Sequence, residues 1–349
     1  MDNGFDKNKF AQKVLITLGI VLPILLLILF FGFAFQVLLL VMAGVLVAVF
    51  FRGIAAFIHS RLHLGMKWSL GISILGVMIV IGLAALFIAP SVSDQAQKLS
   101  QEIPKSVEKL KQQAKGNKAF EDVLSGSFDP QSFMKKQGGW AKKAFGALTT
   151  TLGVLADIYV IFFIGLFFTV SPNPLINGIV SLFPLSRRDR AREVLGAIGK
   201  SLKKWLMAKL LSMTVVGVLT TIGLSILGIP LAFVLGLIAG LLSFIPNFGP
   251  IIALIPAILV AFSQGANQAL YVALLYIGIQ ALESNFITPF IQKNMVSIPM
   301  ALILIAQIVL GVFSSGLGLI LATPIAVTFI VLVKMVYVQD VLGDQSAKD

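Results

Sequence analysis

The residue best suited to chemistry in this chain is an acid, Glu283, placed inside an apolar run. It belongs to the sequence QALESNFITP, residues 280–289. A carboxylate at the centre of a bilayer costs at least about 2.5 to 3.5 kcal/mol, so an acid at that depth is a candidate functional group. Gln280 shares a helix face with Glu283 at a spacing of three, and Pro289 frees the backbone carbonyl near Asn285. We expect Glu283 to bind a proton or a cation.

An equally supported interpretation places Glu283 near the membrane interface, paired with Lys293 or with a helix end. Other polar side chains in apolar runs offer hydrogen bonds to a solute, although pairing between helices explains each of them singly. These further candidates are Asn247, Gln307, Ser314 and Ser315. Asp157 is a secondary candidate that fits a helix or subunit contact better. Lys209 and Lys334 are expected to snorkel from the span ends.

Enzymatic chemistry finds little support in the sequence. The chain has no cysteine, which excludes thiol chemistry and thiolate metal sites. His59 and His63 have the spacing of a metal pair, but no acid lies nearby in the sequence to complete a metal shell. The phosphate-binding pattern GxxxxGK[ST] is absent. We expect no catalytic residue, metal or cofactor.

The composition indicates that the elements holding these residues lie in lipid. Hydrophobic residues make up 58% of the 349 residues, charged residues make up 12%, and the mean hydropathy is +0.98. Soluble domains are about 45–50% apolar and about 25% charged. The formal charge of +12 is spread over short segments between apolar runs. That distribution is typical of the positive-inside bias of membrane proteins and does not favour nucleic-acid binding.

Long apolar runs predict an all-α polytopic membrane protein with about seven or eight membrane helices. The first five runs are expected at about Val14–Phe33, Phe35–Phe51, Ser69–Ala89, Ala147–Val170 and Trp205–Leu227. The first run is too long for the core of a signal peptide, so we expect it to remain as a membrane helix. The predicted domains are 1–90 (N-terminal membrane helices), 91–146 (an extracytoplasmic helical insert), 147–204 (a membrane helix and a basic cytoplasmic linker), 205–338 (a transport core) and 339–349 (a tail).

The lysines and arginines predict the orientation. Lys7, Lys9 and Lys13 precede the first run, and Arg52 and Arg61 follow the second, so both ends of this pair are expected inside. The basic linker at 171–204 is then also inside. This places the N-terminus and the C-terminus in the cytoplasm and the insert at 91–146 outside.

The C-terminal half contains an internal repeat. Two apolar arms flank a turn at Ile245–Pro250, and the stretch from Ile298 matches the stretch from Ile229 at an offset of 69 residues. One connecting helix, about Gln268–Thr288, separates the copies and would invert the second copy. Arms of 13 to 17 residues are short for a full span and suit re-entrant hairpins. Inverted repeats with broken helices are typical of secondary transporters; ordinary short spans with Pro/Gly turns are the alternative.

Three blocks of this half resemble the autoinducer-2 exporter (AI-2E) family of bacterial inner-membrane permeases. They are IPNFGP followed by IIALIPAILVAF, ESNFITPFIQKNMVSIP, and GVFSSGLGLILATP, and the overall plan matches over nearly the whole chain. The resemblance implies homopentamers in which each protomer transports separately, elevator-like movement, and export of the quorum-sensing furanone or exchange of sodium or lithium for protons. Asn247-Phe248 fills the variable middle of the turn, and Lys293-Asn294 replaces the usual Gly-Lys pair. The family positions carried over are Pro246, Gly249, Pro250, Glu283, Asn285, Pro289, Pro299, Gly316, Gly318 and Pro324.

Three functions are therefore considered. The first is a secondary carrier that exports a small polar metabolite, with its site at the hairpin tips and the broken helix at 280–289. The second is a sodium (or lithium)/proton antiporter that uses Glu283. The third is a membrane scaffold without transport activity whose outer insert binds a partner. The expected partners are a small solute or ion, the lipid bilayer and further copies of the chain.

Overall fold

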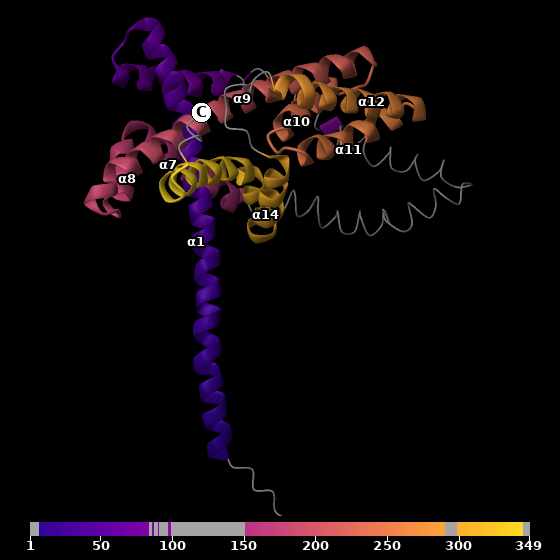
Figure 1. Cartoon of the computed structure of the whole chain (residues 1–349). Coiled ribbons are helices and arrows are strands. Elements are labelled where there is room, and N and C mark those ends of the chain that lie inside the picture. The colour runs from indigo at the N-terminus through magenta and orange to yellow at the C-terminus, as the bar shows by residue number, and fades with distance from the viewer. Residues whose placement is uncertain are drawn as a thin grey trace, which may run out of the picture.

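The computed structural model describes residues 7–83, 86, 90, 97–98, 151–289 and 299–344, and within them every regular element is a helix (Figure 1). The insert predicted at 91–146 lies almost entirely outside the described residues. The helices are α1 (Lys7–Leu62), an unlabelled helix (Met66–Leu83), α7 (Thr151–Val170), α8 (Pro172–Ser181), η1 (Leu185–Arg187), α9 (Arg188–Ile226), α10 (Ala232–Leu242), α11 (Phe248–Phe262), α12 (Ala266–Leu282), η2 (Glu283–Ile287), α14 (Met300–Leu332) and η3 (Val333–Val341).

The predicted all-α polytopic membrane protein is confirmed. In the described part of the chain, five helices are long and apolar enough to cross a membrane, or six if α7 and α8, which meet at 87°, form one broken span. Three shorter apolar helices, α10, α11 and the segment Met300–Ser314, account for much of the difference from the seven or eight predicted. Backbone amides in lipid must be paired within the segment, which explains why apolar runs of this length are helical.

The prediction of two separate helices at about Val14–Phe33 and Phe35–Phe51 is wrong, because both runs belong to one helix. Helix α1 continues without a break through Gly32, and its 56 residues make it about 84 Å long, against about 30 Å for a bilayer core. Figure 1 shows it extending far from the other helices. A single glycine costs only about 1 kcal/mol in a helix, and no proline follows it to end the helix. The orientation relied on a turn between these two runs, so it stays a prediction.

The first predicted hairpin is confirmed as two short helices joined by a tight turn. Helices α10 and α11 have 11 and 15 residues, or about 17 and 23 Å, less than a bilayer core. The turn is shorter than the predicted tip, because α11 already begins at Phe248. Asn247 adopts a left-handed backbone angle with φ of 66°. A Cβ atom at Gly249 would overlap the Leu242 carbonyl, so only glycine fits there.

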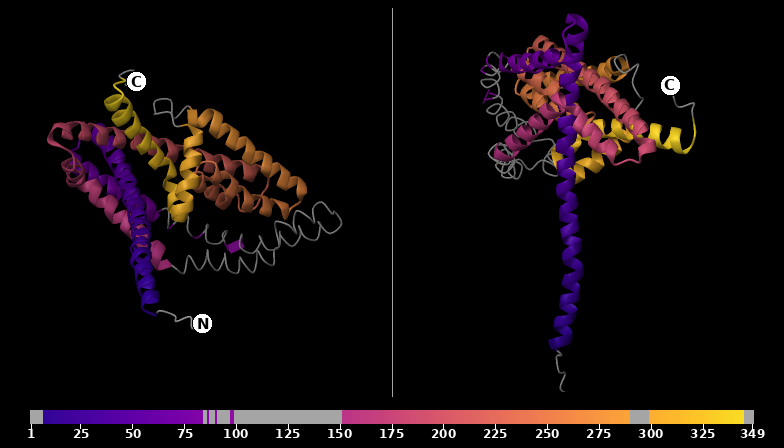
Figure 2. Two further views of the ribbon diagram at one scale, coloured as in Figure 1. Left: turned by 60° about the horizontal axis from the view of Figure 1, so that its bottom comes forward. Right: turned by 90° about the vertical axis from the view of Figure 1, so that its left-hand side faces the viewer.

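The second copy differs from the predicted hairpin because its two arms are joined without a loop. Helix α14 is helical throughout, yet it bends sharply between Met300–Ser314 and Gly316–Val341, and Figure 2 shows the two segments forming a V. The Ser314 hydroxyl donates to the Leu310 carbonyl at 2.7 Å and occupies the space where a Cβ at Gly318 would lie. A Cβ at Gly318 would also overlap the Leu310 carbonyl, so the bend requires glycine at this position. Pro299 caps the start of α14, and Pro324 is fully buried inside it.

Helix α9 connects two hydrophobic cores. Its C-terminal half packs with α10, α11 and α12 around buried residues such as Leu224, Leu235 and Val272. Its N-terminal half packs with α1 and α14 around Leu202 and Trp205. The stretch of α9 between these cores is therefore where the two parts of the molecule meet.

The N-terminal turn of α9 is also bonded to η3, near the C-terminus of the described chain. The Arg190 guanidinium binds both carboxylate oxygens of Asp340 at 2.9 and 3.0 Å. It also donates to Gln339 at 2.9 Å and to the Met335 carbonyl at 3.1 Å. These contacts attach η3 to α9 across about 150 residues of sequence.

Candidate functional site

Glu283 lies at the point where the connecting helix changes its winding. The helix predicted at about Gln268–Thr288 is observed as α12 followed by η2, a five-residue π-helical turn that begins at Glu283. Single π turns inside α-helices occur frequently at functional sites. Glu283 is only 6% exposed. Glu283 is therefore buried at a change in helix winding, and its role at that position stays a prediction.

The Glu283 carboxylate has two partners on α9. The Ser212 hydroxyl donates to Oε1 at 2.6 Å, and the Lys209 ammonium lies 3.4 Å from the same oxygen. Lys209 and Ser212 are three residues apart, so both side chains lie on one face of the helix. The Lys209 and Glu283 side chains are 12% and 8% exposed. We call Lys209, Ser212 and Glu283 the buried triad.

The triad corrects one prediction about Lys209. The side chain was expected to snorkel to the interface, but it points inward, because an opposite charge inside the protein compensates part of the cost of burial. The alternative partner Lys293 lies outside the described residues. Ser212 was not singled out from the sequence. The pattern Lys209-x-x-Ser212 within an apolar run was the signal that could have found it.

Gln280 and Asn285, which were predicted to join Glu283 in a binding site, form hydrogen bonds within their own helix instead. The Gln280 amide donates to the Ser284 hydroxyl at 3.2 Å, within the same helix. Asn285 is exposed and donates to the Ala281 carbonyl at 2.9 Å. These bonds satisfy backbone and side-chain groups of the π turn itself. Pro289 lies at the end of the described helical stretch.

Gln307 connects the second repeat copy to the tip of the first hairpin. Its Nε2 donates to the Pro246 carbonyl at 2.8 Å, and its side chain is 1% exposed. Two candidates from different copies are thus brought into contact. Asn247 is half-buried beside this contact in the turn, and Pro250 lies in the first turn of α11, where a missing N–H costs nothing.

The remaining candidates lie apart from the buried triad. Ser314 uses its hydroxyl on its own helix at the bend of α14. The side chain of Ser315 is outside the described part, and Gly316 borders open space. Asp157 is half-buried on α7, which packs against α1 and α8. Among the described residues, no three His, Cys, Asp or Glu side chains lie close enough to hold a metal ion.

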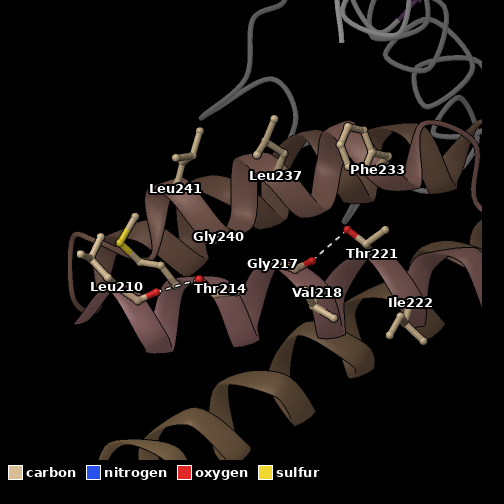
Figure 3. Close-up of a pocket in the computed structure, with 11 residues that line it drawn as sticks. Leu210, Thr214, Gly217, Val218, Thr221, Ile222, Phe233, Leu237, Gly240 and Leu241 are labelled. Carbon is tan, nitrogen blue, oxygen red and sulfur yellow. Dashed lines mark hydrogen bonds between the residues drawn. The ribbon is translucent and has the colours of Figure 1, made fainter. Parts of the chain in front are cut away.

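A groove of about 460 Å³ runs between α9 and α10, and Figure 3 shows the residues that line it. Its lining is mostly aliphatic, and Gly217 and Gly240 in this lining bring the two helices close together. The hydroxyls of Thr214 and Thr221 donate to carbonyls of their own helix at 2.9 and 2.8 Å. None of the polar candidates lines this groove, so it is not suited to hold a polar solute.

A buried ion pair at a π turn and a hairpin of two short helices are typical of a membrane carrier, and sequence comparison agrees. The profile described as AI-2E family transporter matches residues 18–337. The chain belongs to the AI-2E transporter family. The resemblance of the C-terminal blocks is thereby confirmed, and this protein is a multi-pass membrane protein of a transporter family.

Several curated bacterial proteins are similar to parts of this chain. YrrI of Bacillus subtilis is 32% identical over 143 residues, which is 41% of this chain and 40% of YrrI. YueF of the same organism is 31% identical over 147 residues, or 42% of this chain and 40% of YueF. A Thermotoga maritima protein is 31% identical over 164 residues, covering 46% and 49%. The chain thus spans about half the length of these relatives or less. Their names refer to transport and specify no solute.

Proposed function

We propose that this AI-2E family protein is a non-enzymatic secondary transporter that exports a small polar metabolite, of the autoinducer-2 type, across the bacterial inner membrane. The observation that carries the proposal is the buried triad, an ion pair enclosed between α9 and the π turn of the connecting helix. Buried charges are costly, and charged residues inside membrane segments mark substrate or ion pathways.

The triad supports ion coupling by a simple electrostatic argument. Lys209 and Glu283 together carry no net charge, so the site is balanced in the state described here. A cation that reaches Glu283 must displace the Lys209 ammonium from the carboxylate, because two cations at one carboxylate repel each other. Solvent cations and solute movement can thus be linked through the position of one lysine side chain.

The short helices α10 and α11 support the part of the proposal that concerns movement. Their lengths of about 17 and 23 Å fit a re-entrant hairpin, whose tip ends inside the membrane. The tip meets Gln307 of the second copy, and α9 joins the two cores on either side. We propose that these two parts move relative to each other in an elevator-like manner, in each protomer of a homopentamer, with both chain ends in the cytoplasm.

A second candidate, favoured by the same buried triad, is a sodium (or lithium)/proton antiporter. In this case the cation itself is the substrate and no organic solute is needed. Glu283 would alternate between the exchanged cation and a proton. Both candidates use one carboxylate, so a single experiment can compare them.

The test uses purified protein in sealed liposomes that contain a pH-sensitive dye. Labelled autoinducer-2 is offered with and without an imposed proton gradient, and sodium or lithium is added separately without organic solute. For the exporter, solute flux follows the gradient and sodium alone produces no proton movement. For the antiporter, sodium alone moves protons. In both cases Glu283→Gln abolishes coupling, whereas the matched control Asp157→Asn, another acid in an apolar helix, retains it.

Liposomes in which neither solute nor sodium changes any signal relative to protein-free liposomes would overturn both candidates. Such a result favours the scaffold hypothesis. Independently of that result, deletion of about residues 95–143 separates the two classes, because a scaffold loses partner binding without its insert, whereas a carrier retains flux through the helical core.

A further inference from the structure

The Gln307 side chain has one satisfied end and one unsatisfied end. Its Nε2 donates to the Pro246 carbonyl at 2.8 Å. Its Oε1 is buried and has no hydrogen-bond partner in the part of the chain that the structure describes. The orientation of the amide is fixed by chemistry, because only the NH₂ group can face a carbonyl oxygen. The free acceptor therefore points away from Pro246.

A buried acceptor without a donor is costly, so such groups in native proteins call for an explanation. Two hydroxyls near these elements in the sequence are already used. Ser243, three residues before Pro246, donates to the Gly240 carbonyl at 2.8 Å, and Ser314, two turns along α14, donates to the Leu310 carbonyl at 2.7 Å. The described residues thus leave the Gln307 acceptor open to a donor from outside the protein.

The surroundings of Gln307 indicate what kind of donor fits. The hairpin turn 243–249 and the α14 segment 303–311 contain no charged residue. An ammonium group or metal ion would bring an uncompensated charge into this apolar setting, which costs far more than bringing a neutral hydroxyl. A neutral donor is therefore favoured over a cation, in contrast to the buried triad.

We propose that Gln307 is a specificity-determining residue whose Oε1 accepts a hydrogen bond from a hydroxyl group of a small, neutral, hydroxylated solute. The contact lies where the tip of the first hairpin meets the second repeat copy, so the solute binds at the junction of the copies. This inference rests on the proposed function as a solute carrier. It assigns solute recognition to Gln307 and ion coupling to Glu283, which makes the two roles separable.

The test compares Gln307→Met with the wild type in sealed liposomes. Methionine has a similar length and neither donates nor accepts a strong hydrogen bond. Uptake of labelled autoinducer-2 gives KM and maximal rate, and its dependence on a proton gradient reports ion coupling. Erythritol and its tetramethyl ether serve as competitors that differ in hydroxyl donors. The matched control is Thr323→Val, which removes another buried polar atom without a partner from α14.

The expected result is a rise in KM of about tenfold for Gln307→Met, consistent with the loss of one hydrogen bond. Maximal rate and gradient dependence stay within twofold of wild type, and the preference for erythritol over its ether disappears. Thr323→Val keeps the wild-type KM. An unchanged KM in Gln307→Met would overturn the inference and leave the proposed function standing. So would a joint fall of maximal rate and gradient dependence, which indicates a structural role. Absence of uptake by wild type overturns the proposed function itself.

Discussion

The energetic coupling between Lys209 and Glu283 is the most quantitative prediction of this structure. Two unit charges 3.4 Å apart interact by about 5 kcal/mol at an effective dielectric constant of 20. Removing one partner leaves the other charge buried and uncompensated, which typically costs about 3 to 5 kcal/mol. Replacing both removes the charges together, so most of that cost disappears.

A double-mutant cycle measures this coupling directly. Lys209→Met, Glu283→Gln and the double variant are unfolded with SDS in mixed micelles, and the free energy of unfolding is followed by circular dichroism. We expect each single variant to lose about 3 kcal/mol and the double variant to lose less than either, giving a coupling energy of about 3 kcal/mol or more.

The surface pair Arg190 and Glu193 provides the control cycle. Its side chains are 31% and 63% exposed, although the two groups are only 2.7 Å apart. Exposed pairs contribute up to about 1 kcal/mol. A coupling energy for Lys209 and Glu283 no larger than that of this control would refute the view that the triad is a buried, charge-balanced site.

Two further predictions concern the elements that support the site. Gly249→Ala should lower the free energy of unfolding by about 2 kcal/mol, since the added methyl group overlaps α10. Gly278→Ala, whose added methyl group meets nothing within 4 Å, should have little effect. Thermal unfolding of both variants checks this, and equal losses of stability would contradict the hairpin geometry. Arg190→Gln should release η3 from α9 and increase the cleavage of η3 in limited proteolysis severalfold. Arg192→Gln, which removes a bond to Asn177 on α8, should leave η3 protected. Identical digestion of both variants would show that Arg190 does not attach η3 to α9.

The membrane class and most helices were predictable because hydropathy and the need to pair every backbone amide act locally. The helix before Pro289 and the first hairpin follow from apolar length and from proline and glycine positions, and both were found close to the predicted residues. Glu283 was identified because an acid within an apolar run has few explanations.

Features that depend on distant contacts were not predictable from the sequence. The partner of Glu283 is 74 residues away on another helix, so no local pattern distinguishes a snorkelling Lys209 from a buried one. Helix α1 shows the opposite limit, because the runs at about Val14–Phe33 and Phe35–Phe51 were interpreted as two helices where the chain continues as one. At the bend of α14 the glycines suggested a loop, but the helix is intact and Gly318 packs against the Ser314 hydroxyl and the Leu310 carbonyl.

The central claim is that the tip of the first hairpin and the bend of α14 enter the membrane from opposite sides. Single-cysteine labelling tests this claim most directly. The chain has no cysteine, so Phe248→Cys at the first tip and Gly316→Cys at the bend of α14 each introduce one reactive thiol. Both positions are exposed. In oriented membrane vesicles a membrane-impermeant maleimide is expected to label one variant only from the cytoplasmic side and the other only from the periplasmic side. Labelling of both variants from the same side would contradict the inverted arrangement.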